Sequence, residues 1–132
     1  MKYCLYGNDI DENISPIDAC LNWVLKLDKE NFLGKSALLK QKEEGSLKEL
    51  VCMEMSDKCI PRKGYKIYLN DKVIGEVTSG TFSLGLKKGI AMCLIDKGYY
   101  QKKMEVSLNI RNSFKKGKLS KSPFITKTSL YD

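Results

Sequence analysis

The sequence of 132 residues contains no histidine, and its five cysteines form no Cys-x-x-Cys pair. This pattern argues against a zinc site of the usual cysteine and histidine kind, and we expect no metal. An odd number of cysteines scattered through apolar stretches is typical of reduced, buried thiols, which favours a cytoplasmic location over a disulfide framework. The cysteines are Cys4, Cys20, Cys52, Cys59 and Cys93.

Long apolar runs are also absent. No run of 18 apolar residues occurs, so we expect no membrane-spanning helix. The first residues, Met1 to Tyr6, lack the apolar core of a signal peptide, and neither an internal repeat nor a low-complexity segment is visible. Hydrophobic residues make up 42% of the chain, which is enough for a core, and the length fits one domain or one domain plus part of another.

The net charge of +7 is distributed unevenly along the chain. Residues 1–45 carry 6 Lys and 8 Asp or Glu, whereas residues 46–132 carry 17 Lys or Arg and 8 acidic residues. A basic half could bind nucleic acid, an acidic protein, or a polyanionic small molecule such as folate with a polyglutamate tail. Aromatic residues are not interleaved with the basic ones, which argues against nucleic acid, and we expect most lysines to be solvated surface.

The first 45 residues predict two helices. Ser15 and Pro16 form a helix start, with Asp18 against the positive end of the dipole, and the apolar stripe that follows predicts a helix over residues 15–27. Trp23 lies off this stripe and is expected to cover a second surface. The stripe consists of Ile17, Cys20, Leu21, Val24 and Leu25.

A second helix is predicted from about Lys35 to Glu44, ending at Gly45. Its apolar side chains, Ala37, Leu38 and Leu39, are expected to point inward. The composition shifts at Gly45-Ser46, and we place a domain boundary there.

From Lys48 onward, alternating apolar residues and tight turns predict six short strands. We therefore expect an α+β protein, in which a two-helix segment precedes a small antiparallel six-stranded β-barrel of Greek-key or jelly-roll type. Between the strands 73–78 and 90–95, the hydroxyl-rich and glycine-rich stretch Thr78 to Gly89 is predicted to be a loop. Long polar loops between good strands often bind ligands, and we expect Thr78 to Thr81 to close over a site. In this stretch Gly80, Gly85 and Gly89 would allow left-handed backbone or the close approach of another group.

Four stretches, in order along the chain, resemble the aminomethyltransferase family, which comprises the T-protein of the glycine cleavage system and its folate-dependent relatives. The stretches are Cys4 to Glu12 (CLYGNDIDE), Ile60 to Tyr65 (IPRKGY), Ile74 to Ser83 (IGEVTSGTFS) with Leu86 to Met92 (LKKGIAM), and Pro123-Phe124. Together they cover nearly the whole chain, and the resemblance is to the C-terminal part of the family only. Full-length members are expected to have roughly two to three domains, so residues 1–45 would belong to a preceding folate-binding domain and residues 46–132 would be the C-terminal barrel.

The resemblance implies an enzyme that transfers an aminomethyl group from a lipoyl carrier protein to tetrahydrofolate in glycine cleavage. The catalytic carboxylate would lie in the N-terminal part of the family, so we expect this chain alone to be inactive. A family glutamate that contacts folate would fall just ahead of Met1, which predicts that Met1 is a truncation point or a misassigned start. We interpret Asp9, Asp11 and Glu12 as a solvated loop.

Three residues are candidates for binding the folate substrate. Lys29 and Tyr131 are similar in position to an arginine and a late tyrosine of the family's folate pocket. Arg62 follows a proline in a turn, so its guanidinium would be positioned in advance to bind a carboxylate or phosphate. The alternative is a structural salt bridge from Arg62 to the neighbouring domain.

Two alternatives remain open at this point. One is a related folate-dependent demethylase, or a module fused to a dehydrogenase. The other is a free-standing basic barrel that binds RNA.

Overall fold

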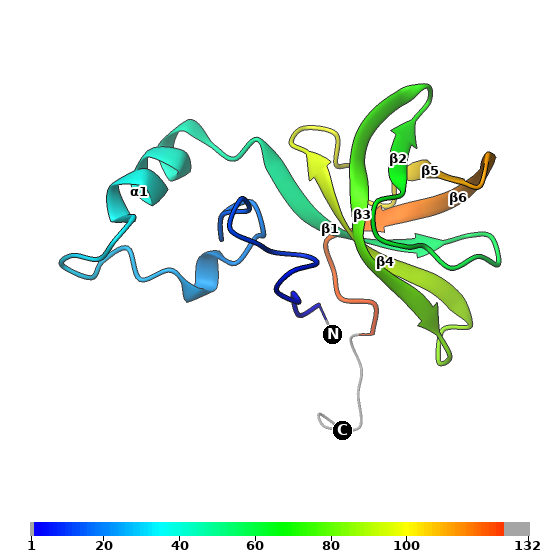
Figure 1. Cartoon of the computed structure of the whole chain (residues 1–132), viewed down its shortest axis with the longest axis horizontal. Coiled ribbons are helices and arrows are strands. Elements are labelled where there is room, and N and C mark those ends of the chain that lie inside the picture. The colour runs from blue at the N-terminus through cyan, green and yellow to red at the C-terminus, as the bar shows by residue number, and fades with distance from the viewer. Residues whose placement is uncertain (1, 126–132) are drawn as a thin grey trace.

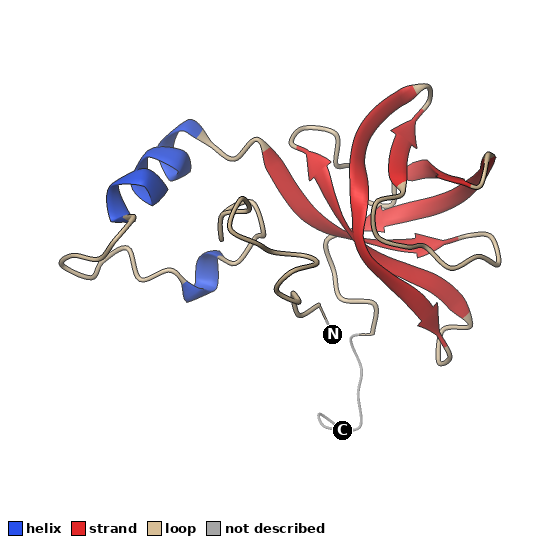
Figure 2. Ribbon diagram, viewed as in Figure 1, coloured by secondary structure: helices blue, strands red, loops and turns tan. Residues whose placement is uncertain are grey.

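A closed six-stranded antiparallel barrel forms the larger part of the molecule (Figures 1 and 2). The computed structural model describes residues 2–125. The strands lie around the barrel in the order β1-β4-β3-β2-β5-β6, so the predicted α+β barrel is confirmed. The strands are β1 (Lys48–Met55), β2 (Lys66–Leu69), β3 (Lys72–Ser83), β4 (Lys88–Asp96), β5 (Glu105–Ile110) and β6 (Ser113–Ser120).

Apolar side chains from all six strands fill the interior of the barrel. The alternation read from the sequence places Val106 and Leu108 of β5 inside, because successive side chains of a strand point to opposite faces. These residues belong to one cluster, which consists of Val51, Met53, Met55, Ile67, Ile74, Val77, Ala91, Cys93, Ile95, Val106, Leu108 and Leu119.

Strands β1 and β4 are also buried on their outer face. Leu50, Met92 and Leu94 form a second, smaller cluster outside the barrel, against which Cys4 and Ile14 of the N-terminal segment pack. A strand that is covered on both faces reads as a continuous apolar run, which explains why Ile90 to Ile95 does not alternate. The N-terminal segment therefore covers one outer patch of the barrel.

The predicted helix over residues 15–27 is wrong beyond its first turn. The Ser15 hydroxyl accepts a hydrogen bond from the Asp18 amide at 3.1 Å, as in a capping box. The turn ends at Cys20, whose backbone adopts the left-handed conformation (φ 57°). Two hydrogen bonds close it, one from the Cys20 amide to the Ile17 carbonyl (3.1 Å) and one from the Leu21 amide to the Pro16 carbonyl (2.8 Å). This pair of bonds is a Schellman motif, which terminates a helix.

The Asp18 carbonyl shows why the turn does not continue. It accepts a hydrogen bond from the amide of Leu50 in β1 at 3.0 Å, a bond that a continuing helix would have replaced with one from Asn22. Only a short 3₁₀ helix, η1 (Asn22–Val24), forms in the rest of the predicted span. Contact with the barrel therefore overrides the amphipathic pattern.

The second predicted helix is confirmed as α1 (Lys35–Glu44), and it stands away from the barrel in Figure 1. Gly45 ends it as predicted, with φ 87° and its amide bonded to the Gln41 carbonyl at 2.9 Å. The expected inward packing is wrong, because none of the residues of α1 is buried and Ala37 and Leu39 are exposed.

The expected long loop from Thr78 to Gly89 is also wrong. Strand β3 continues to Ser83 and β4 begins at Lys88, so only residues 84–87 turn the chain. Residues Ser79 to Ser83 pair with Lys88 to Met92 across this hairpin. The hydroxyl-rich stretch is thus a rigid strand and not a lid.

Candidate functional site

A buried carboxylate, that of Asp9, holds the N-terminal loop of residues 4–12 on the barrel. Asp9 is 1% exposed, so the predicted solvated loop is wrong at this residue, although Asp11 and Glu12 are exposed. One oxygen, Oδ1, accepts hydrogen bonds from the hydroxyls of Thr78 (2.5 Å) and Ser79 (2.7 Å). The other, Oδ2, accepts a bond from the Leu5 amide at 3.0 Å, so the burial of this charge is compensated by three donors.

The same loop is held from a second side by the turn of residues 60–65. Lys63 donates from Nζ to the Gly7 carbonyl at 2.6 Å and approaches Asn8 Oδ1 at 3.4 Å. Within the loop, Gly7 has φ 87° and donates to the Ile10 carbonyl at 2.8 Å. A left-handed glycine closes this tight turn without strain.

Two glycines of the β3–β4 hairpin allow the turn of residues 60–65 to approach closely. A Cβ added at Gly80 would lie 2.5 Å from the Pro61 carbonyl oxygen, and one added at Gly89 would lie 2.1 Å from the Cys59 carbonyl oxygen. The predicted close approach is confirmed at both positions. At Gly85 nothing lies within 4 Å, so the prediction does not hold there. Three of the stretches that resemble the aminomethyltransferase family therefore meet at one place on the barrel.

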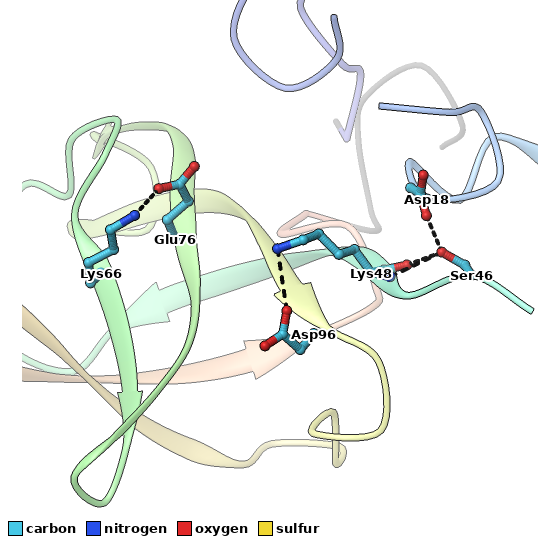
Figure 3. A network of polar contacts seen from close by, with 6 residues as sticks. All are labelled: Asp18, Ser46, Lys48, Lys66, Glu76 and Asp96. Carbon is cyan, nitrogen blue, oxygen red and sulfur yellow. Dashed lines mark hydrogen bonds and ion pairs between the residues drawn. The ribbon is translucent and has the colours of Figure 1, made fainter. Parts of the chain in front are cut away.

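A second polar anchor, Asp18, ties the first helical turn to α1 and to the segment before β1. Figure 3 shows its contact with Ser46. Its carboxylate accepts bonds from Ser15 (Oγ, 2.8 Å), from Gln41 (Nε2, 3.2 Å to each oxygen) and from the Ser46 hydroxyl. Partial burial alone would raise the pKa of the Asp18 carboxyl, but the bonds from Ser46, Ser15 and Gln41 outweigh it and lower this pKa. Asp18 is therefore held in its charged form.

Ion pairs also join neighbouring strands of the barrel. Lys48 pairs with Asp96 at 3.3 Å, and Lys66 pairs with Glu76 at 2.5 Å (Figure 3). All four side chains are about half exposed, so these pairs contribute little to stability.

An open cleft of about 540 Å³ lies between the N-terminal segment and the start of β1. Apolar side chains, three lysines and the carboxylates of Asp28 and Glu49 share its walls, so the lining combines apolar surface with charges of both signs. Among its lining residues are Ile17, Leu25, Leu27, Lys42, Lys48 and Lys97.

Two of the three predicted site residues, Lys29 and Arg62, lie in the described part of the chain, and there no hydrogen bond or ion pair joins their side chains. Lys29 is exposed in the loop before α1, and its carbonyl accepts a bond from Lys35 Nζ at 2.5 Å. Arg62 is exposed in the turn of residues 60–65, and within residues 2–125 its side chain makes no ion pair. Tyr131 lies outside the described residues. Asp9 and Asp18 were missed as anchors because the donors that tie them to other elements are distant in the sequence. These donors are Thr78 and Ser79 for Asp9, and Gln41 and Ser46 for Asp18.

Two other kinds of site, a metal centre and a membrane-spanning helix, are absent from the described part of the chain. Residues 2–125 contain no group of three His, Cys, Asp or Glu side chains placed to hold a metal ion. In the same range, none of the helices is both long and apolar enough to cross a membrane. Two thiols, those of Cys52 and Cys93, are buried, and burial raises the pKa of each; Cys20 is exposed.

Comparison with known proteins matches residues 48–125 to the family described as the glycine cleavage T-protein C-terminal barrel domain. The chain is 43% identical to an aminomethyltransferase of Alkaliphilus oremlandii over 125 residues, which is 95% of the chain and 34% of that protein. It is 46% identical to an aminomethyltransferase of Halothermothrix orenii, over 93% of the chain and 34% of that protein.

A solved structure is similar over almost the same length. The crystal structure of the glycine cleavage system aminomethyltransferase T from Bartonella henselae superposes with a TM-score of 0.86 and 30% sequence identity. The match covers 93% of the chain and 35% of that structure. The chain thus spans about a third of the length of the relatives it matches.

Proposed function

Because the chain belongs to the glycine cleavage T-protein C-terminal barrel family, we propose that it acts as the C-terminal part of an aminomethyltransferase. The reaction transfers a one-carbon aminomethyl unit from the lipoyl arm of a carrier protein to tetrahydrofolate, with release of ammonia. The partners are this carrier and tetrahydrofolate, and the location is cytoplasmic.

In this reaction the chain supplies walls and positioning, and the catalytic carboxylate belongs to the remaining two thirds of the enzyme. Transfer of a reactive one-carbon unit needs a fixed pocket from which water is excluded. The observation that best supports this role is the Asp9 anchor, which fixes the loop of residues 4–12 to the rigid strand β3 through Thr78 and Ser79. A loop held in this way at Asp9, and by Lys63 at Gly7, can present a constant surface to the rest of the enzyme.

Residues 1–45, on this proposal, are part of the preceding folate-binding domain, and Lys29 contributes positive charge to the folate side. The assignment of residues 1–45 to a preceding domain is supported by the exposed apolar side chains of this segment, since monomeric proteins seldom leave large apolar patches uncovered. Trp23 is 74% exposed, and within residues 2–45 Ala19 is the single buried apolar residue. The exposed apolar residues of this segment include Tyr3, Leu5, Tyr6, Trp23, Val24 and Leu33.

A chimera tests the function. Residues 1–132 replace the matching third of the Alkaliphilus oremlandii aminomethyltransferase, and formation of methylenetetrahydrofolate is measured with the aminomethyl-loaded carrier. We expect turnover within about tenfold of the parent enzyme, and no turnover by the 132-residue chain alone. A folded chimera, verified by circular dichroism, that forms no product would overturn the proposal.

A further inference from the structure

The positive charge of the chain is concentrated in the hairpin of β5 and β6 and in the segments that flank it. Residues 100–121 contain seven Lys or Arg and one acidic residue, Glu105. On β6, which is drawn in orange in Figure 1, Phe114, Lys116 and Lys118 are exposed. They lie two residues apart, so their side chains all point to the outer face of the barrel.

An exposed aromatic ring lies at the start of this row. Phe114 is 59% exposed, and it contacts Tyr68 of β2 edge to face, with the ring centroids 5.3 Å apart. Tyr68 is itself half-buried. The contact with Tyr68 fixes the orientation of the Phe114 ring and leaves part of its surface open to solvent.

The turn before β5 adds two lysines at the other end of the row. The Lys103 amide donates to the Leu119 carbonyl at 3.1 Å, and the Leu119 amide donates to the Met104 carbonyl at 3.0 Å. These bonds hold the turn beside the end of β6. The lysines that it exposes there are Lys102 and Lys103.

We call this surface the β6 strip. From Phe114 to Ser120 it extends for about 20 Å, since a strand rises by roughly 3.3 Å per residue. The strip consists of Tyr68, Lys102, Lys103, Phe114, Lys116 and Lys118.

The carboxylates beside the strip already have partners. Glu105 pairs with Lys116 at 2.8 Å, Glu54 pairs with Lys88 at 3.7 Å, and Asp57 accepts a bond from the Lys116 amide at 3.0 Å. Three lysines of the strip form no ion pair among residues 2–125, and these are Lys102, Lys103 and Lys118. Phosphate groups would therefore meet ammonium groups that have no carboxylate partner.

We propose that the β6 strip binds single-stranded nucleic acid, with phosphates on its lysines and a base stacked on Phe114. A row of cations beside an exposed ring suits a linear polyanion whose bases have free faces, whereas a duplex keeps its bases inside the stack. Aromatic and basic residues alternate here with the period of a strand and across two strands, so adjacent residues in the sequence do not show it. The strip would act independently of the function proposed above.

Binding of a labelled oligonucleotide to the 132-residue chain tests the strip. The probe is fluorescein-labelled oligouridine of about 12 nucleotides, which matches the site size of small nucleic-acid-binding barrels. By fluorescence anisotropy at low salt, about 50 mM KCl, we expect a Kd of about 10 μM or lower. Oligothymidine of the same length should bind within about threefold of this value, because stacking and phosphate contact do not depend on the sugar.

Paired lysine variants test the charged part of the strip. Lys102→Gln/Lys118→Gln should raise the Kd at least about fivefold. The matched control, Lys58→Gln/Lys87→Gln, removes two other exposed lysines that form no ion pair among residues 2–125, and it should change the Kd less than about twofold. The slope of log K against log salt should fall by about 1.4 in the strip variant, since each phosphate contact to a single strand contributes about 0.7.

A phenylalanine pair tests the stacking part. Phe114→Ser should weaken binding at least about fivefold and keep the salt slope of the wild type. Phe82→Ser, at a ring that is 37% exposed on β3, should change the Kd less than about twofold. Circular dichroism verifies that each variant is folded.

Four outcomes would overturn the proposal. The first is the absence of binding at low salt, and the second is an equal loss of affinity in a strip variant and its control. The third is a duplex of the same length that binds as tightly as the single strand, because stacking on Phe114 would then have no role. The fourth is displacement of the oligonucleotide by polyglutamate at equal charge concentration, which would identify a general site for polyanions. None of these outcomes affects the test by chimera.

Discussion

The hydroxyl of Thr78 donates a 2.5 Å hydrogen bond to the carboxylate of Asp9, which lies 69 residues earlier in the chain. Both side chains are buried. The bond joins the N-terminal loop to the middle of β3, and the Ser79 hydroxyl reinforces it at 2.7 Å. A charged acceptor with several donors makes a strong anchor, because hydrogen bonds to ionised groups are stronger than those between neutral groups.

Removal of this anchor should lower stability. We expect Asp9→Ala to reduce the free energy of unfolding by about 2–3 kcal/mol, because it leaves the Leu5 amide and the two hydroxyls without their acceptor. Urea unfolding followed by circular dichroism measures the change. Glu12→Ala, at an exposed carboxylate of the same loop, should change stability by less than about 0.5 kcal/mol. Equal effects of the two substitutions would show that Asp9 is no anchor.

The close packing of Gly89 predicts a large effect of a single methyl group. Gly89→Ala should destabilise the barrel by about 3 kcal/mol or more, because the new Cβ would meet the Cys59 carbonyl oxygen at 2.1 Å and backbone must move. Gly85→Ala is the matched control, since no atom lies within 4 Å of its Cβ position, and it should be within about 0.5 kcal/mol of the wild type. Thermal melting of both variants checks this, and a mild effect at Gly89 would contradict the close approach of the two backbones.

The lowered pKa of Asp18 predicts a dependence of stability on pH. A carboxyl whose pKa is lower in the folded state than its ordinary value of 3.8 contributes stability that is fully present above that value. The contribution is lost as the pH falls through the folded pKa. The stability difference between the wild type and Asp18→Asn should therefore be largest above about pH 4 and shrink as the pH falls further. Chemical unfolding at a series of pH values tests this, and a difference that stays constant down to pH 2 would refute it.

The boundary placed at Gly45-Ser46 predicts that the barrel folds without the residues that precede it. A chain of residues 46–132 should keep a β-type circular dichroism spectrum and melt cooperatively. Its melting temperature should be lower, because Leu50, Met92 and Leu94 lose the cover of Cys4 and Ile14. The hydrogen bonds that Ser46 and the Leu50 amide donate to Asp18 are also lost. If the shortened chain is unfolded while the 132-residue chain is stable, the two parts form one domain.

Local sequence determined most of the barrel. The alternation of Val106 and Leu108 with polar residues specified which face of β5 is buried, since side chains of a strand alternate strictly. Arg111 and Asn112 both adopt positive φ, 50° and 62°, and form one of the tight turns expected between the strands, here joining β5 to β6. Gly45 ended α1 as expected. In each of these cases the structure is set by residues that are close together in the sequence, so a local sequence pattern can predict it.

Tertiary structure decided the features that depend on distant partners. The apolar stripe after Ser15 predicted a long helix, but the Leu50 amide took the Asp18 carbonyl and the chain turned at Cys20. Asp9 was assigned to solvent because nothing near it in the sequence indicates that Thr78 and Ser79 would bury and bind it. A hydrogen bond between residues 69 apart leaves no periodic trace, so only the folded barrel, which places β3 beside the N-terminal loop, could determine that this carboxylate is an anchor.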